Sequence, residues 1–176
     1  MDIVVKEGSL KMKLNLGCGK DYREDCINCD ISNSVQKDLN LDFNKKFPLK
    51  DNLVSGVLAK HVLEHALSLE FTLSEIYRVC KNKARIYISV PYFSHESAFS
   101  NYQHKNYFTW TTFDLFNPNH NEHFHTDLKF KVIKKELRGR FKGNKVLVNF
   151  FPRLYQEYLC WIIPVKEIYY ELEVIK

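Results

Sequence analysis

The residues with the clearest chemical potential are two glycines and an acid near the start of the sequence. Gly17 and Gly19 follow a short apolar run that ends at Leu16, and Asp30 closes the next apolar run. Glycine permits a tight turn and leaves no Cβ in the path of a ligand. In an open α/β sheet, ligands bind at the carboxyl ends of the strands, where a carboxylate can accept hydrogen bonds from both hydroxyls of a ribose. The pattern predicts a site for a ribose-containing ligand.

A dinucleotide is the first alternative ligand for such a loop. Its fingerprint has a third glycine, where this sequence has Tyr22, and an acid about 20 residues further on, whereas Asp30 comes much sooner. The carboxylates of Asp21, Glu24 and Asp25 also lie close to the loop. They would repel a pyrophosphate but suit a cationic sulfonium. The sequence therefore disfavours a dinucleotide.

The elements that must position these residues are visible in the hydrophobic pattern. Predicted strands cover residues 13–16, 27–31, 35–39, 52–59, 84–90, 130–137, 145–150 and 168–175, and predicted helices cover 62–80, 111–116 and 153–163. Strands that alternate with helices or loops predict βα units and a mostly parallel sheet. Residues 92–127 form a long, polar and aromatic connection. Such connections in compact domains are usually functional when they are not disordered.

These segments, in this order, resemble the class I S-adenosylmethionine-dependent methyltransferases, close to the type 11 methyltransferase-domain group. The motifs that carry the resemblance run from about residue 13 to residue 95: LNLGCGKD, CINCDI, DLNL, VLAKHVLEH and EIYRVCKNKARIYISVPYFSH. The resemblance implies a Rossmann-like, mostly parallel seven-stranded sheet with helices on both faces and an antiparallel last strand, IYYELEVIK. The sequence departs from the family at one point: the family usually has a longer first helix and a third glycine or small residue after the loop. Here Lys20 and Asp21 follow the glycines directly, so we expect a very short first helix.

The resemblance assigns S-adenosyl-L-methionine as the cofactor. It places the methionine part against the glycine loop, the ribose on Asp30 and the sulfur near the end of the fourth strand. The adenine would lie beside Ile31, with the Asp38 carboxylate at its exocyclic amine. The expected cofactor contacts are Gly17, Cys18, Gly19, Asp30, Ile31, Asp38, Leu39, Lys60 and His61. We expect one domain over residues 1–176, with the cofactor-binding half at 13–91 and a substrate lid and C-terminal half at 92–164.

The methyl acceptor is less well defined. A base is needed only for a hydroxyl or a protonated amine, and histidine suits that task near neutral pH. His95 is the first candidate and His104 the second, with Tyr92, Tyr107 and Trp110 as expected substrate contacts. No N-P-P-Y-like run follows the fourth strand, which disfavours methylation of adenine N6. Small molecules, sugars and lipids are the expected acceptors, with RNA or protein sites and a non-catalytic cofactor-binding protein as alternatives.

Two groups of histidines raise the question of a metal. His61, Glu64 and His65 form H-x-x-E-H, an inverted metalloprotease order. The family that the chain resembles carries similar residues there without a metal, as a helix cap and a packing element, so we expect no metal. The second group is His120, His123 and His125, which lies in a predicted loop. A metal there stays open.

Composition sets the remaining bounds. The 176 residues predict one domain, and the formal charge of +5 is only mildly basic. Basic residues concentrate between 129 and 145, where we expect a solvated face, with nucleic-acid binding as the alternative. Five cysteines fit neither a disulfide framework nor a zinc motif, and no secretory signal is present. We therefore expect a cytoplasmic protein with reduced thiols and no membrane insertion. The sequence does not specify an oligomeric state.

Overall fold

The sheet is the organising element of the computed structural model, which describes residues 12–121, 126–139 and 148–176. Within these ranges seven strands pair in the order β3-β2-β1-β4-β5-β7-β6. The strands are β1 (Lys13–Leu16), β2 (Ile27–Asp30), β3 (Leu39–Asn40), β4 (Val54–Lys60), β5 (Cys80–Pro91), β6 (Phe130–Arg138) and β7 (Glu167–Val174). The pairings among β1 to β5 are parallel, and β7 runs antiparallel between β5 and β6. The predicted mixed sheet with a reversed last strand is confirmed.

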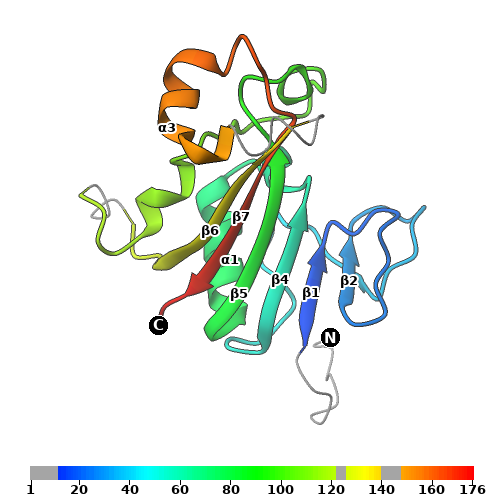
Figure 1. Cartoon of the computed structure of the whole chain (residues 1–176). Coiled ribbons are helices and arrows are strands. Elements are labelled where there is room, and N and C mark those ends of the chain that lie inside the picture. Colours follow the sequence, from blue (N-terminus) through cyan, green and yellow to red (C-terminus); the bar gives the residue numbers. More distant parts are fainter. Residues whose placement is uncertain (1–11, 122–125, 140–147) are drawn as a thin grey trace.

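One face of the sheet is apolar because buried residues recur at every second position of its strands. The fully buried members on the central strands include Leu14, Leu16, Val57, Ala59, Ile86, Ile88, Ile168, Tyr170 and Leu172. Helix α1 (Leu69–Val79) packs behind this sheet in the view of Figure 1 and contributes Leu73, Ile76 and Val79 to the same core. The helix begins at Ser68, whose side chain accepts a hydrogen bond from the backbone N–H of Phe71.

The opposite face of β1, β4 and β5 carries no helix in the described part of the chain (Figure 1). Ion pairs take the place of an apolar layer on the neighbouring strands. Arg85 of β5 lies 3.1 Å from Glu171 and 3.0 Å from Glu173, both on β7. The Arg138 guanidinium lies over the ring of Tyr169, 4.1 Å from its centroid. Helices were expected on both faces of the sheet. In the described part of the chain α1 covers one face of these strands (Figure 1), and charged cross-strand pairs make the other face compatible with water.

The connection between β1 and β2 contains turns and no helix. A polar network holds it, centred on two buried asparagines. The side-chain amide of Asn15 donates to the backbone oxygen of Asp21 at 2.6 Å and to Oδ1 of Asn28 at 3.1 Å. Asn28 in turn donates to the backbone oxygen of Arg23 at 2.9 Å. These bonds satisfy the loop's backbone without helical geometry, so the very short first helix expected from the sequence is replaced by turns.

Several predicted elements differ in detail. The helix predicted over 62–80 is split, because Ala66 is extended between the 3₁₀-helix η1 (Leu63–His65) and α1. Residues 35–38 do not join β3. Residues 148–150, predicted as the end of a strand, are helical, and 145–147 lie outside the described residues. The predicted helix over 153–163 is a short α3 (Pro152–Leu154) followed by a π-helical segment, Tyr155–Leu159.

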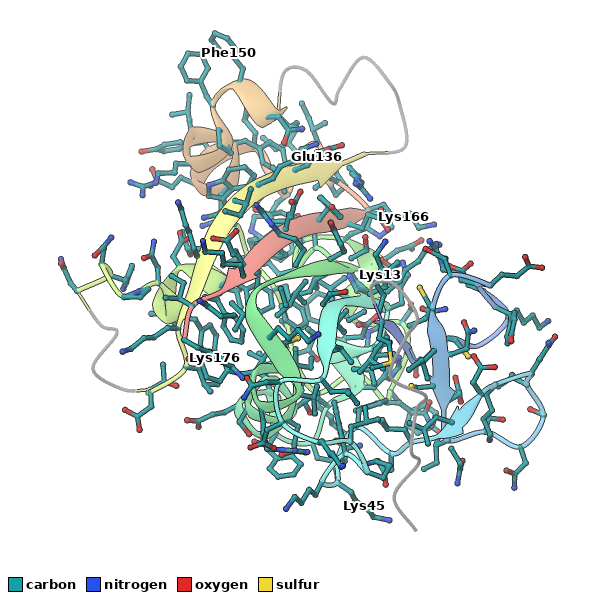
Figure 2. The ribbon with its side chains drawn as sticks, turned by 90° about the horizontal axis from the view of Figure 1, so that it is seen from below. Lys13, Lys45, Glu136, Phe150, Lys166 and Lys176 are labelled. Atoms are coloured by element: carbon teal, nitrogen blue, oxygen red, sulfur yellow. The ribbon has the colours of Figure 1, made fainter. Side chains whose placement is uncertain are left out.

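The long connection after β5 packs over the carboxyl edge of the sheet. It contains two 3₁₀-helices, η2 (Glu96–Ala98) and η3 (Thr112–Phe116), and its Phe108 and Phe113 are fully buried. The segment around α3 exposes large apolar side chains, and Phe150 projects away from the rest of the molecule (Figure 2). Among the described residues, no helix has the length and apolar character that a membrane crossing requires.

Candidate functional site

A cavity of about 510 Å³ lies beyond the carboxyl ends of β1, β2 and β4. This volume falls in the range of about 300–1,000 Å³ that is typical of small-molecule sites. Its wall is formed by residues from five separate stretches of chain: Gly17, Asp30, Ile31, Phe43, Asn44, His61, Val62, His65, Leu67, Tyr102, Gln103 and Lys105. The cavity therefore lies where an open α/β sheet is expected to bind its ligand.

Gly17 forms the bend that opens this cavity. Its φ is +61°, a left-handed conformation that side chains with a Cβ rarely adopt, and a Cβ built there would lie 2.5 Å from Cγ2 of Val62. The loop can thus pass close to Val62 only because position 17 lacks a side chain. This close approach keeps the floor of the cavity free of side-chain atoms at that point.

Asp30 is held rigidly at the cavity wall by backbone donors. Its Oδ2 accepts the N–H of Gly19 at 2.9 Å, and its Oδ1 accepts the N–H of Ser32 at 2.8 Å. Each carboxylate oxygen can accept more than one hydrogen bond, so both keep capacity for a ligand hydroxyl. The neighbouring Ile31 is 56% exposed, which gives the cavity an apolar surface beside a fixed anion.

Two predicted adenine contacts lie outside the cavity lining. The carboxylate of Asp38 accepts hydrogen bonds from the backbone and side-chain N–H groups of Asn28, both at 2.8 Å, and from the hydroxyl of Tyr22 at 2.8 Å. Burial alone would raise the pKa of Asp38, but these hydrogen bonds lower it below its ordinary value. Leu39 is buried in the core. In this structure Asp38 fastens the loop before β2 and Leu39 anchors β3, and a contact of either residue with the adenine stays a prediction.

Three further predicted contacts also lie outside the cavity lining. Cys18 is buried, and its thiol lies 3.6 Å from the backbone oxygen of Gln36. Burial raises the pKa of this thiol, which keeps it protonated. Gly19 acts through its N–H on Asp30, and Lys60 is exposed at the end of β4. Of these three residues, Gly19 alone is connected to the cavity, through its hydrogen bond to Asp30.

His61 stands at the end of β4 with a φ of +54°, an uncommon conformation for this residue type. Its Nε2 lies 3.2 Å from Glu167 and its Nδ1 lies 3.4 Å from the buried Glu64. Hydrogen bonds to Glu167 first, and to Glu64 second, raise the pKa of His61 to about 9. The ring is therefore a cation at neutral pH, fixed between two carboxylates at the cavity wall.

The outer wall of the cavity comes from the connection after β5. Tyr102, Gln103 and Lys105 line it, and their segment is attached to η1 by hydrogen bonds. The backbone N–H of Lys105 donates to the carbonyl of Glu64 at 2.7 Å. The side-chain amide of Asn106 donates to the carbonyls of Leu63 at 3.1 Å and Ala66 at 2.7 Å. This part of the expected lid is thus packed against the end of β4 rather than free.

The two candidate bases occupy different places. His95 caps η2: its Nδ1 accepts the N–H of Ser97 at 3.1 Å, and it does not line the cavity. His104 lies between two lining residues, and its ring centroid is 4.7 Å from that of His65, which itself lines the cavity. The structure therefore places the second candidate, and not the first, beside the cavity.

The expected substrate contacts do not gather at the cavity. Tyr92 is fully buried, and its hydroxyl donates to Gln156 at 3.2 Å. Tyr107 stacks on Phe99 with ring centroids 4.9 Å apart. Trp110 borders a smaller hollow beside Phe150 to Leu154. The three rings support the fold or a separate surface, and their contact with a substrate stays a prediction. Of the histidine cluster, His120 lies in a turn, while His123 and His125 lie outside the described residues.

Sequence reasoning missed several residues of the wall. These are Phe43, Asn44, Val62, His65, Leu67, Gln103 and Lys105. Phe43 and Asn44 follow β3 by a few residues, whereas the contacts predicted from the sequence beside this strand are Asp38 and Leu39. Asn44 is drawn in because its Oδ1 accepts the N–H of Leu67 at 2.8 Å. No local pattern reveals such a contact between distant segments.

The residues present fit a nucleoside cofactor that carries a positive charge. Gly17 gives a backbone wall that a Cβ would fill, Asp30 offers a fixed pair of acceptors, and Ile31 offers an apolar face. Asp21, whose carboxylate pairs with Arg23 at 3.0 Å, and the exposed Glu24 add negative charge on the loop after β1. This arrangement suits a sulfonium better than a pyrophosphate, which requires free backbone donors at a helix N-terminus.

Comparison with known proteins agrees with this site. Residues 14–88 match the family model for a methyltransferase domain. No curated protein gives a significant sequence match to the chain. Among solved structures, the YcgJ protein from Bacillus subtilis is 10% identical and superposes with a TM-score of 0.63 over 94% of this chain and 92% of its own.

Two further solved structures share the fold. An S-adenosylmethionine-dependent methyltransferase from Mesorhizobium loti is 11% identical, with a TM-score of 0.61 over 94% of this chain and 91% of that one. One from Archaeoglobus fulgidus is 16% identical, with a TM-score of 0.58 over 93% and 86%. The matched segment contains the glycine loop, Asp30 and the residues after β4. The chain therefore resembles a methyltransferase domain over residues 14–88 and shares its fold with these solved structures.

Proposed function

We propose that this chain binds S-adenosyl-L-methionine in the cavity and transfers its methyl group to a small-molecule acceptor, such as a sugar or a lipid. The observation that carries the proposal is the Asp30 carboxylate, which two backbone N–H groups fix at the wall of a 510 Å³ cavity. Ile31 provides the apolar surface for the adenine, and the Gly17 backbone borders the methionine part. When bound, the cofactor supplies an electrophilic methyl on a cationic sulfur.

The protein's own contribution is orientation. Holding an acceptor atom in line with the methyl supplies up to about 7–11 kcal/mol of the barrier reduction. The wall opposite the glycine loop consists of His65, Tyr102, Gln103 and Lys105, which offer polar groups to an acceptor. We place the acceptor at this wall. Of the two candidate bases, His95 and His104, we assign His104 a role beside the acceptor.

A nucleic-acid acceptor is disfavoured by the charges of β6. Lys135 donates to the Asp114 carboxylate at 2.7 Å, Lys134 pairs with Glu136 at 3.2 Å, and Arg138 pairs with Glu167 at 3.5 Å. Cations that are already paired contribute little to a field that attracts phosphates. Within the described residues, the basic region of the sequence is thus largely compensated on the protein itself.

Titration calorimetry with S-adenosylhomocysteine tests the cofactor assignment. We expect wild type to bind, and Asp30→Ala to bind at least about 10-fold more weakly, because hydrogen bonds to a charged group contribute about 1.5–3 kcal/mol. Asp25→Ala is the matched control, since it removes an exposed carboxylate that faces Lys13 at 3.7 Å. It should bind like wild type. Absence of binding to folded wild type would contradict the proposal, and an equal loss in both variants would mean that Asp30 acts only through bulk charge.

A further inference from the structure

The wall opposite the glycine loop brings together three groups that ligate metals. One carboxylate oxygen of Glu64 and one ring nitrogen each of His65 and His104 all lie within 4.8 Å of one another. Glu64 and His65 come from η1, directly after β4, and His104 comes from the connection after β5. None of these three residues is among the expected cofactor contacts. The H-x-x-E-H pattern alone did not predict this cluster, because its third member is distant in sequence.

Glu64 is unusual because its charge is buried and only half satisfied. The residue is 1% exposed, and its Oε1 lies 3.4 Å from the Nδ1 of His61. Its Oε2 has no hydrogen-bond partner among the described residues. Leaving a buried polar atom unpaired lowers the stability of the fold, and more so for a charged group. A cation bound at Oε2 would remove this penalty.

The ring of His104 is oriented as a metal ligand requires. Its Nδ1 lies 2.9 Å from the carbonyl oxygen of Ala98. A carbonyl can only accept, so Nδ1 carries the proton, and in the neutral ring Nε2 keeps its lone pair. Histidines that bind metals nearly always donate their other N–H to a carbonyl, a carboxylate or water in this way. His65, whose ring lies edge-on to that of His104 at 73°, has no hydrogen bond to its ring nitrogens within the described chain.

The scaffold that carries the cluster is fixed before any ligand binds. The N–H groups of Lys105 and Asn106 both donate to the carbonyl of Glu64, at 2.7 and 3.2 Å. Asn106 also clamps both ends of η1 through its side chain. These bonds hold the residue after His104 against the residue before His65. The three ligating groups therefore share a small rigid unit, although they come from two connections.

We propose that Glu64, His65 and His104 bind a divalent first-row transition metal ion such as Zn²⁺ at the edge of the cavity. Two histidines and one carboxylate are a known ligand set for zinc sites that keep an open position. Ligands at about 2.0–2.1 Å from a tetrahedral ion are about 3.4 Å apart, so the groups need to close by about 1 Å. Nitrogen ligands disfavour Mg²⁺ and Ca²⁺, which prefer oxygen.

The site gives the proposed function a more specific acceptor, and this part rests on that function. His65 lines the cavity, so an ion there can bind an acceptor hydroxyl and lower its pKa. The hydroxyl proton passes to water, the S–CH₃ bond breaks with its electrons left on sulfur, and an O–CH₃ bond forms. His104 is then a metal ligand instead of a base, and the acceptor class is an alcohol, such as a sugar or other polyol.

The test is calorimetric titration of the chelator-treated chain with ZnCl₂. We expect wild type to bind one Zn²⁺, and Glu64→Gln and His104→Gln to bind at least about 100-fold more weakly, since loss of an outer-shell partner alone costs about 10–100-fold. The matched control is His95→Gln, which removes a histidine of the same connection whose ring is bound to Ser97. It should bind Zn²⁺ like wild type.

The titration of each variant with S-adenosylhomocysteine separates the two proposals. Unchanged affinity for that probe in Glu64→Gln and His104→Gln would show that the cavity is intact, so that lost Zn²⁺ binding reports the cluster itself. Failure of wild type to bind Zn²⁺ overturns the metal site and leaves the cofactor assignment standing. Equal Zn²⁺ binding by all variants also overturns it, because the ion then sits elsewhere, for example on Cys26, which is partly exposed.

Discussion

At Gly17 the backbone and the packing both demand glycine, whereas at Gly19 only the backbone does. The φ values are +61° and +50°. A Cβ at position 17 meets Val62 at 2.5 Å, but at position 19 no described atom lies within 4 Å. The two positions therefore separate conformational strain from overpacking within one loop.

This difference predicts unequal losses of stability. Gly19→Ala should lower the free energy of unfolding by about 1 kcal/mol, the cost of a left-handed conformation. Gly17→Ala should lower it by about 3 kcal/mol, because overpacking adds about 1–3 kcal/mol. Urea denaturation followed by circular dichroism measures both values. Equal losses would mean that Val62 moves aside without cost.

Single residues at the site could be predicted where one strand ends and its loop begins. Gly17, Asp30, Ile31 and His61 all line the cavity, and each directly follows or closes a strand that the hydrophobic pattern located. Asp38 could not be placed, because its partner Asn28 looks like an ordinary strand residue until the buried network is seen. Local patterns indicate position along the chain, but not which of two nearby acids faces inward.

At the scale of elements, α1 is fastened to the connection before β4 by Arg78. The guanidinium donates twice to Glu75, at 2.8 and 2.7 Å, and to the carbonyls of Leu49 at 2.8 Å and Phe47 at 3.0 Å. Glu75 is buried, and it also accepts the N–H of Phe47 at 2.6 Å. Burial would raise the pKa of Glu75, but Arg78 and Phe47 lower it below its ordinary value of 4.5.

Removing this arginine should be costly. Arg78→Leu leaves the Glu75 carboxylate buried without its cation, so we expect a loss of about 3 kcal/mol in the free energy of unfolding. Arg85→Leu is the control, because that arginine pairs on the more open face and should cost no more than about 1 kcal/mol. The comparison is made by urea denaturation near neutral pH. Similar losses in the two variants would rule out a special role for the buried pair.

The pH dependence of this pair has a defined sign. Because the pKa of Glu75 is lowered on folding, the pair stabilises the fold above its ordinary pKa of 4.5 and ceases to do so as pH falls below that value. The difference in the free energy of unfolding between Arg78→Leu and wild type should therefore be smaller in acid than near neutral pH. Denaturation at pH 6 and pH 3.5 measures this, and a constant deficit would contradict the linkage.

Element types were predictable, but some of their boundaries were not. The 3.6-residue period found α1, yet the turn at Ala66 depends on Asn106, which donates to its carbonyl from forty residues away. The loop after β1 has no helix because buried asparagines satisfy its backbone, a role that composition does not reveal. Tertiary hydrogen bonds thus decide where local periodicity stops.

For the whole molecule, the seven strands, their mostly parallel pairing and the reversed last strand agree with expectation because the family resemblance implies them. A solvated face was expected for residues 129–145 but not its extension to β5 and β7, since alternation of Glu and Tyr in β7 looks the same whether a helix or water lies above it. Its ion pairs join β5, β6 and β7 across the sheet.

These ion pairs predict a salt dependence. Glu171→Gln combined with Glu173→Gln should cost about 1 kcal/mol at low salt, because Arg85 loses both partners. The difference from wild type should shrink between about 0.01 M and about 1 M NaCl, as the Debye length falls from about 30 Å to about 3 Å. Urea, which is uncharged, is the suitable denaturant. A difference that is independent of salt would mean that the glutamates act by packing alone.

The position of β7 determines when the sheet can be completed during synthesis of the chain. β7 pairs with both β5 and β6, and the sheet order places β6 next to no other strand. While the ribosome has yet to add residues 167–174, β5 has an open edge and β6 has no place in the sheet. An unpaired edge of this kind is a template for wrong pairing between chains. The nascent chain is thus most in need of a chaperone just before its last strand emerges.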